Sequence, residues 1–101
     1  MTSIELAAPK MALVVEDDPF MQAAVDDYLT SLGYHVVTGS SYEDALDELR
    51  RAARPFQLAI VDIALPFDTN STASRHDALG LDLVSQIKSN WASTAVVIWS
   101  A

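Results

Sequence analysis

Three acidic residues have the type and the placement to bind a metal ion and to take part in phosphoryl chemistry. Glu16 and Asp17 follow the apolar run 11–15, and Asp62 closes the apolar run 58–62. Mg²⁺ prefers oxygen ligands and is typically bound by one or two carboxylates together with water and phosphate oxygens. A carboxylate can also attack phosphorus and form an aspartyl phosphate. These acids are therefore candidates for a magnesium-dependent phosphoryl-transfer site.

The placement of Asp62 follows from the strand that carries it. Residues 57–62 form a short apolar stretch, and Pro66 stops the pattern, which is typical of a strand buried on both faces of a parallel sheet. An ionised carboxylate in the middle of such a core would be strongly destabilising. We therefore expect Asp62 at the carboxyl edge of the sheet, where ligands bind in open α/β folds.

Three further apolar runs predict the other strands, at residues 11–15, 34–38 and 95–99. Helical patterns lie between the strands, and this alternation predicts one α/β domain with a parallel sheet and helices on both faces. With the strand order 2-1-3-4, the first and third strands are neighbours, so their carboxyl ends bring the three acids together. Unpaired, the carboxylates would repel one another and raise their pKa values, and a divalent cation relieves that repulsion.

The helices have sequence signals at their ends. Pro19 fits the first turn of a helix that extends to Leu32, with Gly33 as its stop. The apolar residues of this helix share roughly one face, namely Phe20, Ala24, Val25, Tyr28 and Leu32. A second helix runs to about Ala53, and its buried side is predicted to consist of Ala45, Leu46 and Leu49.

Two capping boxes compete at the start of the second helix, Ser40 with Glu43 and Ser41 with Asp44. A long polar loop, 67–78, precedes the third helix, whose apolar spacing is given by Leu79, Leu83, Val84 and Ile87.

Composition narrows the classes of partner. The 101 residues include no cysteine and carry a net charge of −8. This charge disfavours direct binding to nucleic acid or to an anionic membrane, and it suits a metal cation or a basic partner. The sequence has no apolar run long enough to cross a membrane and no secretory signal, so we expect a cytoplasmic protein in which residues 1–9 are a lead-in.

Four segments carry a resemblance to a known family: ALVVEDDP at 12–19, LAIVDIALP at 58–66, GLDLV at 80–84 and VVIWSA at 96–101. In this order they resemble the receiver domains of two-component response regulators, and the similarity spans residues 10–101. The resemblance implies a flavodoxin-like sheet and a phosphorelay module rather than a turnover enzyme. Its implied partner is a histidine kinase or a phosphotransfer protein.

The resemblance also implies a role for each site residue. Asp62 is similar to the phosphoacceptor, and Asp17 to the direct Mg²⁺ ligand. Glu16 would assist the metal through water, and the backbone carbonyl of Ala64 would be a further ligand. Ser100 is similar to the switch hydroxyl that turns toward the phosphoryl group.

The sequence departs from the family pattern at two places. Gly80 comes later than in the family, which indicates an insertion beside the site. The family's fifth strand, last helices and phosphate-pairing lysine would follow Ala101. Without them, we expect an unpaired fourth strand and a bare face on the first helix, and therefore either a dimer with a second copy or a fragment of a longer parent.

Other interpretations of the acids remain open. Asp62 is also suited to capping a turn, and Glu16 with Asp17 to a solvated acidic turn. A degenerate receiver would act only as a binding or dimerisation module, without phosphorylation. A haloacid-dehalogenase-type phosphatase needs a second acid two residues after the nucleophile, and Ala64 occupies that position.

Overall fold

The fold is a parallel sheet, seen in a computed structural model that describes residues 9–68 and 77–99. The strands lie in the order β2-β1-β3-β4, and each neighbouring pair is parallel. Their bounds are Lys10–Val15 for β1, Tyr34–Gly39 for β2, Leu58–Asp62 for β3 and Ala95–Trp99 for β4. The predicted strands and their order are confirmed.

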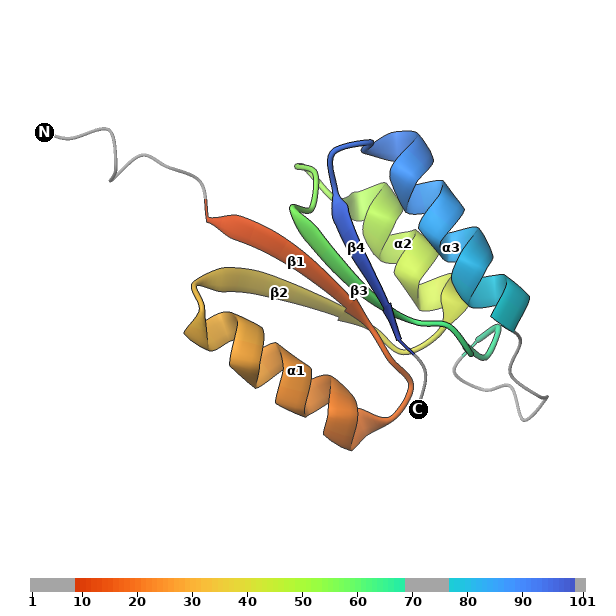
Figure 1. Cartoon of the computed structure of the whole chain (residues 1–101), viewed down its shortest axis with the longest axis horizontal. Helices are drawn as coiled ribbons and strands as arrows, with labels where there is room; N and C mark the ends of the chain where they lie inside the picture. The colour runs from red at the N-terminus through yellow and green to blue at the C-terminus, as the bar shows by residue number, and fades with distance from the viewer. Residues whose placement is uncertain (1–8, 69–76, 100–101) are drawn as a thin grey trace, which may run out of the picture.

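Three helices connect the strands and lie on both faces of the sheet. They are α1 (Pro19–Ser31), α2 (Tyr42–Arg51) and α3 (Asp77–Asn90). Helix α1 covers one face, while α2 and α3 lie side by side on the other (Figure 1). In the described residues no helix has the length and apolar character needed to cross a membrane.

The alternation of side chains along the strands divides the core into two unequal parts. On β1, Leu13 and Val15 join the larger cluster beneath α2 and α3, whereas Ala12 and Val14 join the smaller cluster beneath α1. The larger cluster contains the predicted inward residues Ala45 and Leu49 of α2 and Leu83 and Ile87 of α3. All four strand residues are buried, as expected for a strand covered on both faces.

Most of the apolar residues predicted to share a face of helix α1 are exposed to solvent. Phe20 is 86% exposed and Tyr28 is 64% exposed, and Leu32 is also exposed. The buried residue is Leu29, which lies outside the predicted group, with Val25 packed partly against the same cluster. Of the five residues predicted to share a face, Val25 is therefore the one that packs against the core.

Side-chain caps fix where the first two helices begin. Asp18 accepts hydrogen bonds from the N–H groups of Phe20 and Met21 at the start of α1. Ser41 accepts one from the N–H of Asp44, at 3.1 Å, so the second of the two competing capping boxes marks the start of α2. Gly33 follows α1 with a φ of 97°, the left-handed conformation that favours glycine after a helix.

The first turn of α2 is also bonded to the chain that leaves β3. The N–H of Tyr42 donates to the carbonyl of Pro66 at 3.0 Å, and the N–H of Glu43 donates to that of Phe67 at 2.9 Å. The rings of Tyr42 and Phe67 stack with their centroids 6.1 Å apart. These bonds satisfy two of the donors that a helix start leaves unpaired, and they join α2 to the segment following Asp62.

Glycine at position 80 lets α3 approach the end of β3. A Cβ atom at this position would overlap the backbone of Ile63, the residue after Asp62. The Tyr42 hydroxyl donates a hydrogen bond to Asp82, two residues further along α3, and this contact raises the pKa of Tyr42. Close contact with α3 and α2 therefore supports the chain segment that carries Asp62.

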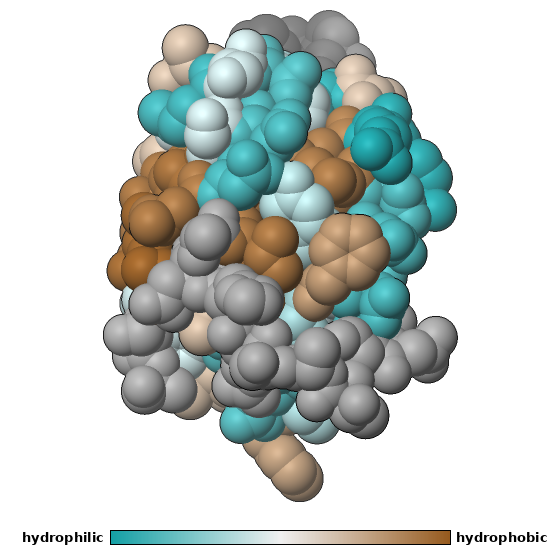
Figure 2. All heavy atoms as spheres, turned by 90° about the vertical axis from the view of Figure 1, so that its right-hand side faces the viewer, coloured by the Kyte–Doolittle hydropathy of each residue, from teal (hydrophilic) through white to brown (hydrophobic). Residues whose placement is uncertain are grey.

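Strand β4 lies at the edge of the sheet. Its side chains are uncharged, and Val97 and Ile98, which point to opposite faces, are 49% and 43% exposed. Apolar surface, drawn in brown, gathers in patches on the side of the molecule seen in Figure 2. Within the described residues, β4 pairs with β3 alone. The outer edge of the fourth strand is therefore unpaired in this part of the chain, as predicted.

Several sequence predictions lie outside the described residues. They concern the switch hydroxyl of Ser100, the lead-in 1–8 and the part of the polar loop between 69 and 76. They stay predictions.

Candidate functional site

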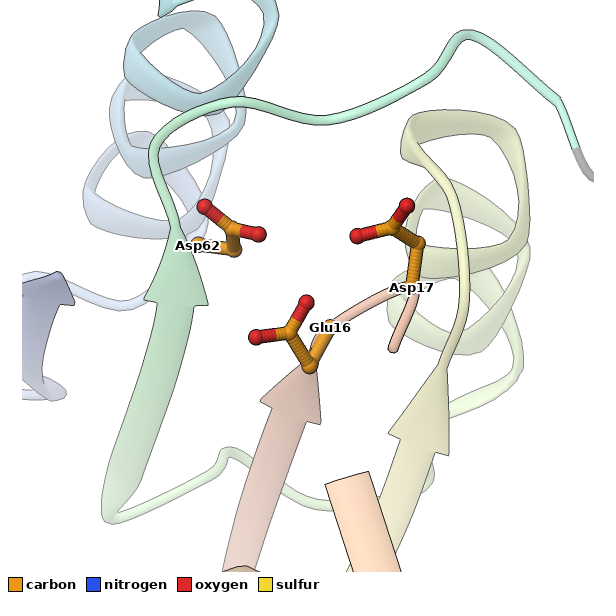
Figure 3. Close-up of side chains that lie close together, drawn as sticks. All are labelled: Glu16, Asp17 and Asp62. Carbon is orange, nitrogen blue, oxygen red and sulfur yellow. The ribbon is translucent and has the colours of Figure 1, made fainter. Parts of the chain in front are cut away.

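The three predicted acids converge at the carboxyl edge of the sheet. Val15 of β1 pairs with Val61 of β3, so Glu16 and Asp62, one residue further along each strand, emerge side by side. One carboxylate oxygen from each of Glu16, Asp17 and Asp62 lies within 4.8 Å of the others. Figure 3 shows the three carboxylates pointing toward one another above the ends of the strands.

Burial makes this cluster electrostatically unfavourable without a cation. Glu16 is only 4% exposed and Asp62 only 3% exposed, and Asp17 is partly buried. Burial, together with the neighbouring carboxyls of Asp62 and Asp17, raises the pKa of Glu16 to about 7, although a backbone hydrogen bond from Asp18 acts in the opposite direction. The donor set of three carboxylates fits a hard divalent cation such as Mg²⁺, which takes oxygen ligands.

Backbone and side-chain hydrogen bonds hold the acids in place. The N–H of Ala64 donates to Asp62 Oδ1 at 3.0 Å, and the N–H of Asp18 donates to Glu16 Oε2 at 3.2 Å. The next residue, Ile63, donates its N–H to the carbonyl of Trp99 at 2.9 Å, which ties this loop to the end of β4. Ala64 thus lies in the loop beside the site, while the role of its carbonyl as a ligand stays a prediction.

Gln22 is a supporting residue that the sequence did not reveal. Its Nε2 donates to the carbonyl of Glu16 at 2.9 Å, to that of Gly39 at 3.3 Å and to Ser40 Oγ at 3.2 Å. It therefore connects the chain leaving β1 with the chain leaving β2. A glutamine in the second turn of a helix has no distinctive spacing, so no sequence signal would have identified it.

The basic side chains of the described residues are engaged elsewhere. Lys88 Nζ donates to the carbonyls of Ala92 and Thr94, at 2.8 and 2.7 Å, where it closes the end of α3. Lys10 lies over the ring of Tyr34, at 5.9 Å from its centroid. Within residues 9–68 and 77–99, both ion pairs lie on α2, so none connects a basic side chain to the three acids.

The raised pKa of Glu16 predicts pH-dependent magnesium binding. Below pH 7 the folded, metal-free protein holds a proton on Glu16, and Mg²⁺ must displace it, so the affinity should rise with pH. One competing proton with a pKa of about 7 weakens binding about tenfold at pH 6 relative to pH 8. Isothermal titration calorimetry at several pH values measures this slope.

The Glu16→Gln variant is the control for this titration, because it removes the titrating group and should flatten the slope. The same proton affects folding, because folding raises the pKa of Glu16 from 4.5 to about 7. The contribution of Glu16 to the free energy of unfolding of the metal-free protein is therefore greatest below pH 4.5, and it is lost as the pH rises through 7. An unchanged slope in Glu16→Gln would show that another group titrates.

Comparison with known proteins gives a consistent result. The family described as response regulator receiver domain matches residues 12–101. The chain is similar to the response regulator TrrA from Thermotoga maritima, solved in complex with Mg²⁺ and beryllium fluoride, at 25% identity and a TM-score of 0.69, covering 91% of this chain and 70% of that one. No curated protein matched the sequence.

Two further structures support the same fold. A receiver protein from Pseudomonas putida is 27% identical, with a TM-score of 0.69, and the match covers 93% of this chain and 69% of that one. A CheY-like receiver domain protein from Methanospirillum hungatei is 20% identical, with a TM-score of 0.72, over 92% of this chain and 65% of the other. The chain thus spans about two thirds of the length of these relatives.

Proposed function

This chain belongs to the response regulator receiver domain family, and from that premise we propose that it is a phosphoacceptor module of a two-component phosphorelay. The observation that carries the proposal is the meeting of three carboxylate oxygens within 4.8 Å at the carboxyl edge of the sheet. The magnesium bound in the structure of TrrA supports a metal at the equivalent place. Receiver domains are signalling modules, and we propose that this one catalyses at most its own phosphorylation and dephosphorylation.

Asp62 is the proposed phosphoacceptor. A carboxylate oxygen of Asp62 attacks the phosphorus of a phosphohistidine on a histidine kinase or phosphotransfer protein. A P–O bond forms, the P–N bond breaks, and its electron pair leaves with the imidazole. The N–H of Ala64, which donates to Asp62 Oδ1, orients the carboxylate during this step.

Asp17 and Glu16 are the proposed metal-binding partners of Asp62, with the carbonyl of Ala64 as a further ligand. When bound, Mg²⁺ would neutralise the charge of the transferred phosphoryl group. Asp17 would hold the ion directly, and the more buried Glu16 would assist through water. Ser100 is proposed as the hydroxyl that responds to phosphorylation and thereby changes contacts with partners.

A small phosphodonor tests this proposal. Incubation with acetyl phosphate and Mg²⁺ should add the mass of one phosphoryl group, and intact-protein mass spectrometry detects it. Chelation of the metal or the variant Asp62→Asn should abolish the gain. Asp68→Asn, on the same loop, is the control that should still be phosphorylated. A gain that survives in Asp62→Asn would contradict the assignment of the acceptor.

Self-association is the second property that we propose. Strand β4 offers an uncharged edge with two half-exposed branched side chains, and an unprotected edge of this kind is a template for strand pairing. The exposed face of α1, with Phe20 and Tyr28, offers a second apolar surface. If the chain dimerises in light scattering and never gains a phosphoryl group, it is instead a degenerate receiver that works only by binding.

The proposed setting is the cytoplasm, which fits a chain without cysteine. We propose no direct binding to nucleic acid or membrane, because a net charge of −8 would be repelled by both.

A further inference from the structure

A cavity lies at the opposite edge of the sheet from the acids, where the strands begin. It measures about 360 Å³ and is bounded by the start of β1, the chain entering β3 and the turn before β4. The length of a five-residue strand, about 16 Å, separates this edge from Asp62. A cavity of this size falls within the range that holds small organic ligands.

The apolar part of the lining consists of Pro9, Met11, Pro55 and Phe56. Phe56 is 2% exposed, its ring meets Trp91 edge-on at 5.6 Å, and its carbonyl accepts a hydrogen bond from Thr94 Oγ1 at 2.6 Å. The core therefore fixes Phe56 but leaves almost none of its surface to the cavity, so the apolar surface offered to a ligand comes from Pro9, Met11 and Pro55.

The polar part of the lining supplies donors and no acid. It consists of Arg54, Gln57 and Ser93. Gln57 Oε1 accepts from the N–H of Met11 at 2.7 Å, which fixes the orientation of the carboxamide. No hydrogen bond to a described residue occupies the Gln57 NH₂ group, so it remains available as a donor.

Arg54 differs from its neighbours on and after α2. Arg50 and Arg51 form ion pairs with Asp47 and Glu48, whereas the contact of Arg54 within the described residues is with the sulfur of Met11, at 3.2 Å. Its side chain also lines an adjoining cavity of about 220 Å³. This guanidinium is therefore a cation without an anionic partner in the described part of the chain.

The charge of the surroundings supports an anionic ligand. The chain has six basic residues in all, and five of them lie at this edge of the fold: Lys10, Arg50, Arg51, Arg54 and Lys88, of which Arg50 and Arg51 are paired with acids. We propose that the cavity binds a small organic anion, with one carboxylate or phosphate held by Arg54, Gln57 and Ser93 and an apolar body against Met11 and Pro55. Fork-shaped guanidinium groups favour such anions through paired hydrogen bonds.

Probe binding tests this site on the full chain without Mg²⁺. Phenyl phosphate and phenylacetate are titrated separately, with benzyl alcohol as the neutral probe, and amide shifts of Met11 and Gln57 are followed by NMR. At least one anion should bind five times or more tightly than benzyl alcohol, and the stronger of the two identifies the head group. Equal binding of all three would overturn the proposal.

Matched variants assign the binding to Arg54. Arg54→Gln should lower the affinity for the anion at least fivefold. Arg50→Gln removes the same charge from a residue outside this cavity and should leave the affinity within twofold of the unmodified chain. Gln57→Glu keeps an acceptor for the Met11 N–H, adds a negative charge and should abolish binding. Equal losses of anion affinity in Arg54→Gln and Arg50→Gln would overturn the proposal. So would binding of an acidic peptide at this cavity if neither small anion binds.

This test is independent of the phosphorelay proposal. Asp62→Asn should bind the anionic probe as the unmodified chain does, because the two sites lie at opposite edges of the sheet.

Discussion

Asp17→Asn is expected to lower the magnesium affinity of the chain about 100-fold or more, because even outer-shell partners of a metal contribute 10–100-fold to affinity. The variant removes one of the three carboxylates that meet within 4.8 Å. It should also raise the melting temperature of the metal-free protein, since it lowers the repulsion among buried acids. Calorimetry measures the affinity, and thermal unfolding in the presence of a chelator measures the stability.

Asp18→Asn is the matched control, since it changes the adjacent acid in the same way. The side chain of Asp18 caps α1 by accepting from Phe20 and Met21, and asparagine is an equally good capping residue. Magnesium affinity should therefore stay within about twofold. If Asp18→Asn lowers the magnesium affinity as much as Asp17→Asn does, the loss reflects the lower total negative charge near the site. The assignment of Asp17 as a ligand would then be wrong.

Gly80→Ala is expected to destabilise the fold by about 3 kcal/mol, at the upper end for overpacking in a filled core. The added Cβ overlaps the backbone of Ile63, and backbone cannot move aside as a flexible side chain would. Urea unfolding measures the loss. Because Ile63 follows Asp62, the variant should also weaken magnesium binding in whatever fraction remains folded.

Ser85→Ala serves as the reference for this change, since Ser85 is an exposed residue of the same helix. Its stability should change by less than about 0.5 kcal/mol. A Gly80→Ala protein as stable as Ser85→Ala would mean that α3 can move away from β3 at little cost.

The sheet and the acid cluster could be predicted because their signals are local. Each strand is a short apolar run, and the parallel arrangement puts residues at the strand ends on one edge. Glu16 and Asp62 each follow or close such a run, so their meeting required only that β1 and β3 be neighbours. The supporting bonds from Gln22 could not be predicted, because they connect segments that the sequence does not relate.

The buried face of α1 shows where periodicity is insufficient. Phe20 and Tyr28 recur at helical spacing with Leu32, yet the helix buries Leu29 and partly Val25 instead. The spacing identifies an apolar stripe, but which residues are buried depends on how the helix is placed against the sheet, where its larger contacts are with β1 and β2.

The bonds between α2 and the segment after Asp62 have a dynamic consequence. The amides of Tyr42 and Glu43 donate to Pro66 and Phe67, so they can exchange their hydrogens with solvent only when that segment lifts away. Motion of the loop beside Asp62 is therefore mechanically linked to unwinding of a helix start more than twenty residues earlier in the chain. Protection of these two amides would report how often the acid edge of the sheet opens.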